Sequence, residues 1–321
     1  MNRIMIVGGA GYIGGYLTDY LNATAKHVLV YDKLVYENRY LKDVPFVFGD
    51  ISDTDKLGRT IEEWQPDVIV WLAALVGDGA CQVDPALTNK VNYESVKWLT
   101  DNYDGKIVFT STCSVYGVND EIITEQAATN PLSVYASTKL KAEQYLLNNS
   151  NNCLIFRLGT LFGISDRHSR LRLDLVANIL TLKAVRGEAL SVFGGEQWRP
   201  LLHVKDVARA INHGIRSEIT GLYNLHSDNY TIKQLAEKIV EVVDPEATIN
   251  YEDMPFEDLR NYKVSSASYR DKGWYPAFNL EDGINELASI LKDGRIKDTT
   301  DSVYSNARYI KEIVNVLSGN Y

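Results

Sequence analysis

The sequence predicts an α/β protein built on a doubly wound parallel sheet, followed by a smaller mixed α/β lobe. Short apolar runs typical of buried strands recur in the first half of the chain, at residues 4–7, 28–31, 46–48, 68–72, 107–109 and 154–156. Amphipathic helical patterns lie between these runs, for example at Leu57, Ile61 and Trp64. Strands that alternate with helices favour a parallel sheet covered on both faces. Such a sheet binds ligands beyond the carboxyl ends of its strands.

The first strand run leads into a glycine-rich turn. Residues 8–14 read GGAGYIG, and an apolar helical pattern continues through Leu17 and Leu21. Glycines at a strand-to-helix turn let backbone amides approach a pyrophosphate at the helix N-terminus. The next strand run ends in Asp32, where a carboxylate accepts hydrogen bonds from an adenosine ribose and repels a 2′-phosphate. This order of elements predicts a Rossmann-type domain that binds NAD and not NADP.

After the last of these runs the pattern changes to shorter elements. Helical patterns recur at residues 207–215, 232–243, 284–291 and 310–317. Thr231 followed by Gln234 predicts a capping box at the start of the second of these helices. We expect a Rossmann domain over residues 1–160, with part of 201–230 returning to it. A second lobe with a helical tail is expected over residues 161–321.

The composition excludes several classes of function. The chain has 42 acidic and 33 basic residues and a net charge of -9, without a Lys/Arg block, so nucleic acid is not an expected partner. The three cysteines and five histidines show no ligand spacing, so neither a disulfide framework nor a metal site is expected. No apolar stretch approaches the length of a membrane-spanning helix, and the chain begins with a strand run instead of a signal peptide. We expect a soluble cytoplasmic protein.

A Tyr–Lys pair is the most informative feature for the chemistry. Tyr135 and Lys139 are spaced i and i+4, so on a helix they lie one above the other. A free Tyr titrates near pH 10, and its use as a base at neutral pH requires a pKa depression of about three units, or about 4 kcal/mol. A neighbouring ammonium is the simplest source of that stabilisation. Because this spacing is common on helices, the interpretation depends on the rest of the chain.

The rest of the chain carries the motifs of one known family. It resembles the extended short-chain dehydrogenase/reductases that act on nucleotide sugars, the NAD-dependent epimerase/dehydratase group, as far as about residue 291. The matching segments are GxxGxxG at 8–14, GDI at 49–51, LAA at 72–74, Asn92, FTSTCSVYG at 109–117, Tyr135 with Lys139, RLGTLFG at 157–163, WRPLLHVKDV at 198–207 and GWYP at 273–276. Within this family, the chain is similar to the UDP-glucose 4-epimerases. Segments 74–78 and 170–175 resemble a branch of surface-polysaccharide pathways that includes GDP-heptose C4-dehydrogenases.

The resemblance implies an NAD site at the carboxyl ends of the strands. Asp50 and Ile51 would contact the adenine, whereas Lys139 would bind the nicotinamide ribose and hold Tyr135 at a depressed pKa. The expected NAD ligands are Gly8, Gly11, Tyr12, Ile13, Gly14, Asp32, Lys33, Asp50, Ile51, Leu72, Ala73, Ala74, Thr110, Tyr135 and Lys139.

The resemblance also implies a nucleotide-diphosphate sugar as substrate, with Thr112, Tyr135 and Lys139 as the catalytic residues. Tyr135 would take the proton of the sugar's C4 hydroxyl while hydride passes to the nicotinamide, and Thr112 would hydrogen-bond the same oxygen. Arg199 and Arg260 match positions that grip the diphosphate, which suits the guanidinium fork. The expected substrate contacts are Thr112, Cys113, Ser114, Thr160, Arg172, Leu175, Val192, Phe193, Arg199 and Arg260. Thr160 stands where many relatives have Asn.

The residues beside Thr112 bear on the reaction. Dehydratases of the family resemble Thr-Asp-Glu here, because they need an acid and a base, whereas this chain has Thr-Cys-Ser. Epimerases that invert carbons beside a ketone use a cysteine at the position of Ser114. Cys113 is one residue away and points to the other side of an extended loop, as a packed small residue does.

The expected reaction is therefore 4-epimerisation with retained NAD. Asp32 disfavours an NADPH-dependent reductase. A C4 dehydrogenase or reductase that releases the 4-keto sugar uses the same residues and stays open. A dinucleotide sensor without chemistry is a further alternative.

Two more expectations concern association and the tail. The helices beginning near Asn92 and Tyr135 carry more apolar residues than one sheet face needs, among them Tyr93, Trp98, Leu140, Leu146 and Leu147. Relatives pair these helices in a homodimer; the alternative is that they only cover their own sheet. The tail 292–321 lies outside the resemblance, and its pattern indicates a polar connector and a short amphipathic helix of unassigned use.

Overall fold

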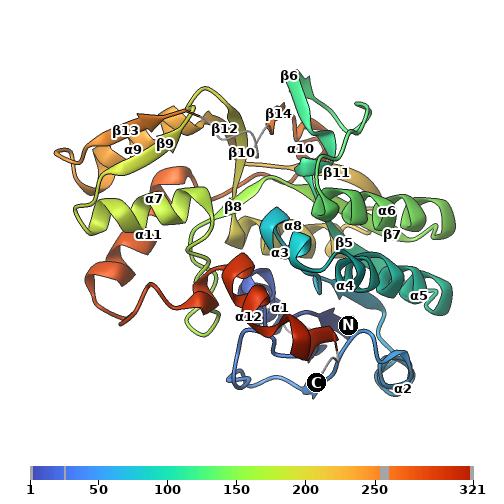
Figure 1. Ribbon diagram of the computed structural model, residues 1–321. Helices are drawn as coiled ribbons and strands as arrows, with labels where there is room; N and C mark the ends of the chain where they lie inside the picture. The colour runs from blue at the N-terminus through green and yellow to red at the C-terminus, as the bar shows by residue number, and fades with distance from the viewer. Residues whose placement is uncertain (1–2, 25–26, 254–259, 319–321) are drawn as a thin grey trace.

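A seven-stranded sheet forms the centre of the molecule (Figure 1). The computed structural model describes residues 3–24, 27–253 and 260–318. The strand order is β11-β7-β5-β4-β1-β2-β3, and every neighbouring pair is parallel. These strands are β1 (Arg3–Val7), β2 (His27–Asp32), β3 (Phe46–Phe48), β4 (Val68–Trp71), β5 (Lys106–Thr112), β7 (Cys153–Leu158) and β11 (Gly221–Leu225). The predicted α/β class with a Rossmann-type parallel sheet is confirmed.

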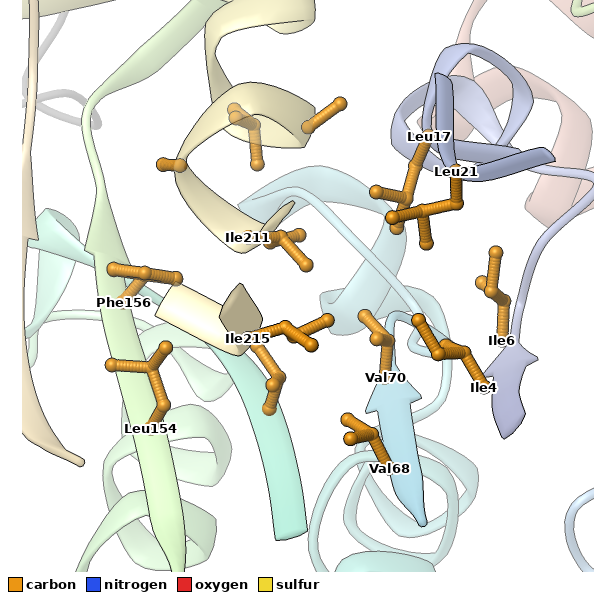
Figure 2. Close-up of a cluster of buried hydrophobic side chains, with 14 of the residues drawn as sticks. Ile4, Ile6, Leu17, Leu21, Val68, Val70, Leu154, Phe156, Ile211 and Ile215 are labelled. Carbon is orange, nitrogen blue, oxygen red and sulfur yellow. The ribbon is translucent and has the colours of Figure 1, made fainter. Parts of the chain in front are cut away.

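Helices cover both faces of this sheet because side chains alternate along its strands. On β1, Ile4 and Ile6 face α1 (Tyr12–Ala23) and α8 (Val204–Arg216). Figure 2 shows these residues with Leu17 and Leu21 of α1 and Ile211 and Ile215 of α8, packed into one buried cluster.

The opposite face buries the other half of the strand residues. Met5 and Val7 of β1 belong to a second cluster there. Neighbouring strands add to this cluster, and three helices cover it: α2 (Thr54–Trp64), α5 (Ser95–Asn102) and α6 (Val134–Asn149). The chain from β4 to α5 runs through α3 (Asp78–Val83), α4 (Pro85–Asn89) and a π-helical turn, Lys90–Glu94. A short 3₁₀ turn, Cys113–Tyr116, follows β5.

The second lobe is mixed. Its sheets are β8 (Thr160–Phe162) with β10 (Trp198–His203) and β12 (Asp228–Thr231), and β9 (Leu190–Phe193) with β13 (Ile249–Glu252). A further pair joins β14 (Asn261–Val264) to β6 (Val118–Ile123), which comes from the expected first domain. Its helices are α7 (Val176–Val185), α9 (Ile232–Val243), α10 (Ala267–Arg270) and α11 (Leu280–Lys292). The predicted capping box is confirmed, because Thr231 accepts from the Gln234 amide and the Gln234 side chain accepts from the Thr231 amide. β11 returns the chain to the large sheet.

The chain ends in a 3₁₀ turn, Ser302–Tyr304, called η3, and in α12 (Asn306–Ser318). Helix α12 packs against α3 of the first lobe, so the tail crosses back from the second lobe (Figure 1). Within the described ranges, no helix has the length and apolarity needed to span a membrane.

Candidate functional site

A cavity of about 560 Å³ opens at the carboxyl ends of β1, β2 and β4. Many of the predicted NAD ligands line it: Gly8, Gly11, Tyr12, Ile13, Gly14, Asp32, Lys33, Asp50, Ile51, Leu72, Ala73 and Ala74. The carboxyl ends of parallel strands meet at one edge of the sheet, which is why residues so far apart in sequence converge here.

The glycine turn is built for close approach. Gly8 has φ +86°, and a β carbon on it would lie 2.5 Å from the backbone nitrogen of Ala73. A β carbon on Gly14 would lie 2.5 Å from the α carbon of Gly9. The missing side chains of Gly8 and Gly14 therefore allow the turn to pack directly against neighbouring backbone. A β carbon on Gly11 would have one near neighbour, the Gly8 carbonyl oxygen, at 3.4 Å. Because Gly11 lines the cavity, its missing side chain leaves space there for a ligand. This cradle at the start of α1 fits a dinucleotide pyrophosphate.

Replacing Gly14 with Ala is expected to destabilise the protein by about 1–3 kcal/mol, because the added methyl overpacks the turn. The matched variant Gly11→Ala should unfold at nearly the wild-type urea concentration but bind NAD more weakly, since its methyl projects into the cradle. Urea unfolding and NAD titration of both variants check this. Equal unfolding midpoints for the two variants would contradict the different roles assigned to these glycines.

Acidic residues define the far end of the cavity. The Asp32 carboxylate accepts hydrogen bonds from the amides of Ala10, at 2.9 Å, and Leu34, at 2.7 Å. Burial raises the pKa of Asp32, and these two amides oppose the shift. Lys33 pairs with Asp50 at 2.6 Å. A ribose hydroxyl can donate to the remaining lone pairs of Asp32. A 2′-phosphate would meet a carboxylate.

Thr112, at the end of β5, and Tyr135 and Lys139, on α6, form a second group beside the cavity. Tyr135 packs against an apolar cluster that contains Leu75, which also lines the cavity. A hydrogen bond with Thr112 and the charge of Arg172 both act to lower the pKa of Tyr135. Lys139 is buried, and its Nζ lies 4.1 Å from the centre of the Phe109 ring.

The pKa shifts of Tyr135 and Lys139 differ from the expected depression of the Tyr135 pKa. Burial raises the pKa of Tyr135, and Cys81 and Asp78 raise it further, so both effects oppose the depression that the sequence argument expects. Burial lowers the pKa of Lys139 to about 7. A low dielectric disfavours an isolated charge on either partner. The sequence argument counted the attraction between the two groups but not the cost of desolvating them.

The turn after Thr112 is closed by internal contacts. The Thr112 hydroxyl donates to Ser114 Oγ and accepts from the Ser114 amide, each at 3.1 Å. Ser114 Oγ lies 3.3 Å from the Tyr262 hydroxyl. Cys113 is fully buried, and its thiol donates to the Arg157 carbonyl at 3.2 Å. Cys113 is therefore a packed small residue, as the argument from the extended loop predicts, and its side chain is not exposed toward a substrate.

The expected diphosphate-binding arginines lie close to one another. Arg199 donates to the Arg260 carbonyl and to the Trp198 carbonyl. Arg260 pairs with Asp78 at 2.9 Å, and Asp78 accepts from Ser133, the N-cap of α6. Arg260 is thus linked to the helix that carries Tyr135.

Arg172 lies apart from these arginines, in the wall of the cavity itself. It pairs with Asp174 at 2.6 Å.

The remaining predicted residues are dispersed. Thr110 is buried within β5. Thr160 begins β8, Leu175 is the N-cap of α7, and Val192 is buried in β9. Phe193 is 44% exposed. In the part of the chain that the structure describes, no group of His, Cys, Asp and Glu is arranged to hold a metal ion.

Several residues that line the cavity were not predicted, whereas Asn92, one of the positions of the family resemblance, supports the cavity without lining it. Tyr36, Arg170, Asn306 and Leu317 line it, and the last two come from the tail. Asn92, in the π-helical turn, bonds both the amide and the carbonyl of Leu75, at 2.8 and 2.9 Å, and so holds the loop after β4. A π-helical turn is frequent at functional sites, although no sequence signal predicts it.

Comparison with known proteins identifies this arrangement. The model of the NAD dependent epimerase/dehydratase family matches residues 4–225. The chain is 28% identical to the UDP-glucose 4-epimerase of Rhizobium meliloti over 309 residues, covering 87% of this chain and 94% of that protein. It is 27% identical to the dTDP-glucose 4,6-dehydratase of Escherichia coli over 341 residues, covering 88% and 92%.

Solved structures have the same fold. The UDP-glucose 4-epimerase of Thermotoga maritima with UDP-glucose superimposes with a TM-score of 0.81 at 24% identity, covering 92% of this chain and 100% of that one. The UDP-glucose 4-epimerase of Thermus thermophilus in complex with NAD gives a TM-score of 0.78 at 25% identity, covering 90% and 99%.

Proposed function

From the premise that the chain belongs to the NAD-dependent epimerase/dehydratase family, we propose that it is a nucleotide-sugar 4-epimerase. The family makes it an extended short-chain dehydrogenase/reductase with NAD as cofactor, acting on nucleotide sugars. The finer statement, which reaction it runs, is the proposal. The relatives include epimerases, dehydratases and decarboxylases, so the choice among them depends on this chain's own residues.

The chemistry of the turn after β5 carries the proposal. Elimination of water from C5 and C6 of a sugar needs an acid and a base in addition to the C4 oxidation. Here residues 112–114 supply two hydroxyls that bond each other and one thiol that is buried against Arg157. No carboxylate or accessible thiol comes from this turn. The remaining chemistry is oxidation and reduction at C4.

Three residues perform that chemistry in the proposed mechanism. Bound NAD supplies the acceptor and later the donor of the C4 hydride. Tyr135 takes the proton of the C4 hydroxyl as the hydride leaves, and Thr112 hydrogen-bonds the same oxygen. Lys139, in its protonated form, would stabilise the Tyr135 phenolate through its charge. The 4-ketone would then turn over in the pocket, and Tyr135 would return the proton to the C4 oxygen as C4 is reduced from its opposite face.

The proposed substrate contacts come from residues of the second lobe. Arg199 and Arg260 would hold the diphosphate, with Val192 and Phe193 beside the base and Thr160 and Leu175 nearer the sugar. Asp32, Asp50 and Ile51 would hold the adenosine half of NAD. The expected pathway is surface-polysaccharide synthesis, as the segments 74–78 and 170–175 suggest.

A homodimer through α5 and α6 is part of the proposal. Leu146 is fully buried in the core, whereas Leu147 of the same helix is 42% exposed, so only part of the expected apolar surface is available. The Tyr93 and Tyr145 rings lie edge to face on this surface, 6.3 Å apart. Light scattering by the purified protein tests the dimer, and a monomer would overturn it.

A panel of nucleotide sugars tests the reaction. The native protein is incubated with UDP-, dTDP-, GDP- and CDP-sugars, C4 configuration is followed by NMR, and any dinucleotide released on denaturation is identified. We expect C4 epimers to interconvert without net NADH. Stoichiometric NADH with a 4-keto sugar and no epimer would overturn the epimerase in favour of a C4 dehydrogenase.

A further inference from the structure

The C-terminal tail lies against the cofactor cavity, although it is outside the matched family region, residues 4–225. Two of its side chains, Asn306 and Leu317, belong to the cavity wall. Figure 1 shows α12 at the front of the molecule, below α3. A solvated connector would not be expected to bury side chains there.

Asn306 joins three segments at the edge of the cavity. It is 3% exposed. Its side-chain nitrogen donates to the Val76 carbonyl at 2.7 Å, and its side-chain oxygen accepts from Arg170. Its amide donates to Asp174 at 2.9 Å. One buried side chain thus connects the loop after β4 to the second-lobe loop that carries Arg170 and Arg172.

Apolar and aromatic contacts extend this attachment along α12. Ile310 is 1% exposed and packs in a cluster with Leu75 and Cys81, against which Tyr135 also packs. Tyr309 and Tyr36 have ring centroids 5.3 Å apart. Tyr36 belongs to the loop after β2, which lies next to Asp32 at the adenosine end of the cavity.

Arg170, from the second lobe, also holds the tail against the cavity. Its guanidinium lies 3.7 Å from the centre of the Tyr36 ring, and it donates to the Val303 carbonyl of η3 at 2.8 Å. The Leu173 amide donates to the Tyr304 carbonyl at 3.0 Å. The loops after β2 and β4 and the loop 170–174 are therefore all attached to the tail.

A polar connector precedes this closure. Residues 293–301 are mostly exposed, and Gly294 has φ +65°. Ile296 of this connector packs against a buried cluster of the second lobe, whereas the contacts at the cavity come from η3 and α12. A surface segment held by Asn306, the apolar cluster around Ile310 and the contacts of Arg170 and Leu173 can open without unfolding either lobe.

We propose that η3 and α12 are part of the cofactor site: they close the dinucleotide cavity, Asn306 latches them, and NAD leaves only when the latch opens. The inference rests on NAD as the cofactor and holds for either C4 reaction. It deepens the proposed function, because a hydride that must return to the same sugar requires a cofactor that stays bound. Asn306 acts through the loops it holds and is a positioning residue.

The rate of NAD release tests this without any sugar. The protein is loaded with NADH and chased with excess NAD, and the loss of bound nicotinamide fluorescence gives the release rate. Asn306→Ala removes the contacts to Val76 and to the charged Arg170, so release should be faster by about tenfold or more. Lys311→Ala, on the exposed side of the same helix, should release at the wild-type rate.

A reversible cross-link tests the same motion from the other side. A β carbon on Gly79 of α3 would lie 3.1 Å from the β carbon of Ala307 of α12. A disulfide needs about 3.5–4.5 Å, which a small relaxation supplies. The double variant Gly79→Cys/Ala307→Cys should release NADH more slowly when oxidised and recover on reduction. The native cysteines are all buried and do not compete.

Three results would overturn the proposal. One is wild-type release from a folded Asn306→Ala protein, with folding checked by thermal melting. Another is a cross-link that forms without slowing release. The last is a cysteine pair that stays reduced under oxidising conditions, since α12 would then not lie on α3. A wrong assignment of the sugar reaction changes none of these readouts, because no sugar is present in them.

Discussion

Replacing Tyr135 with Phe is expected to lower sugar turnover by about 10²–10⁴-fold while NAD stays bound. The substitution removes the oxygen that accepts the C4 proton and keeps the ring that packs against the cluster around Leu75 and Cys81. The fold and the cofactor cavity should therefore be preserved. Turnover of the preferred nucleotide sugar and the NAD content of the purified protein are the two measurements.

A tyrosine on the same helix provides the control. Tyr145 of α6 donates to Asp101 at 2.6 Å and lies outside the cavity wall. Tyr145→Phe should turn over sugar at close to the wild-type rate. Turnover by Tyr135→Phe within tenfold of the wild type would remove Tyr135 from the base role. It would also favour the alternative hypothesis that this chain is a dinucleotide sensor.

Replacing Arg157 with Met is expected to destabilise the protein by about 3–5 kcal/mol, because it leaves a carboxylate buried without its partner. Arg157 is 4% exposed and Glu143 is 1% exposed. The guanidinium bonds both Glu143 oxygens, and it donates to the Tyr116 hydroxyl at 2.7 Å. Since Glu143 lies on α6, this pair fixes the helix that carries Tyr135 and Lys139.

Urea unfolding of single and double variants measures this effect. The double variant Arg157→Met/Glu143→Leu should lose less stability than Arg157→Met alone, since neither charge is then buried without a partner. An Arg157→Met protein within about 1 kcal/mol of the wild type would mean that water or another cation reaches Glu143. The pair would then not be the anchor described here.

Much of the first lobe follows from local sequence signals. Apolar runs predicted the strands because a parallel sheet buried on both faces needs apolar side chains at every position, as Ile4 to Val7 supply on β1. The glycine turn was equally readable, because its backbone geometry at Gly8 excludes other residues. The capping box at Thr231 is a contact between residues close in sequence, which makes it predictable.

Features that depend on burial or on distant contacts could not be predicted from the sequence. The 3₁₀ turn after β5 was not predicted, although the argument from an extended loop correctly placed Cys113 as a packed residue. The raised pKa of Tyr135 arises from desolvation, which only the folded environment determines. Asn306 meets Val76 across 230 positions of sequence, so no periodicity could assign the tail to the cofactor cavity.

The central claim is internal oxidation and reduction at C4 with retained NAD, and isotope transfer tests it most directly. A nucleotide sugar carrying deuterium at C4 is converted in the presence of excess unlabelled NADH, and product and dinucleotide are analysed by mass spectrometry and NMR. The account predicts a C4 epimer that keeps its deuterium and a free NADH pool without label. Deuterium in the free NADH pool, together with a released 4-keto sugar, would contradict it.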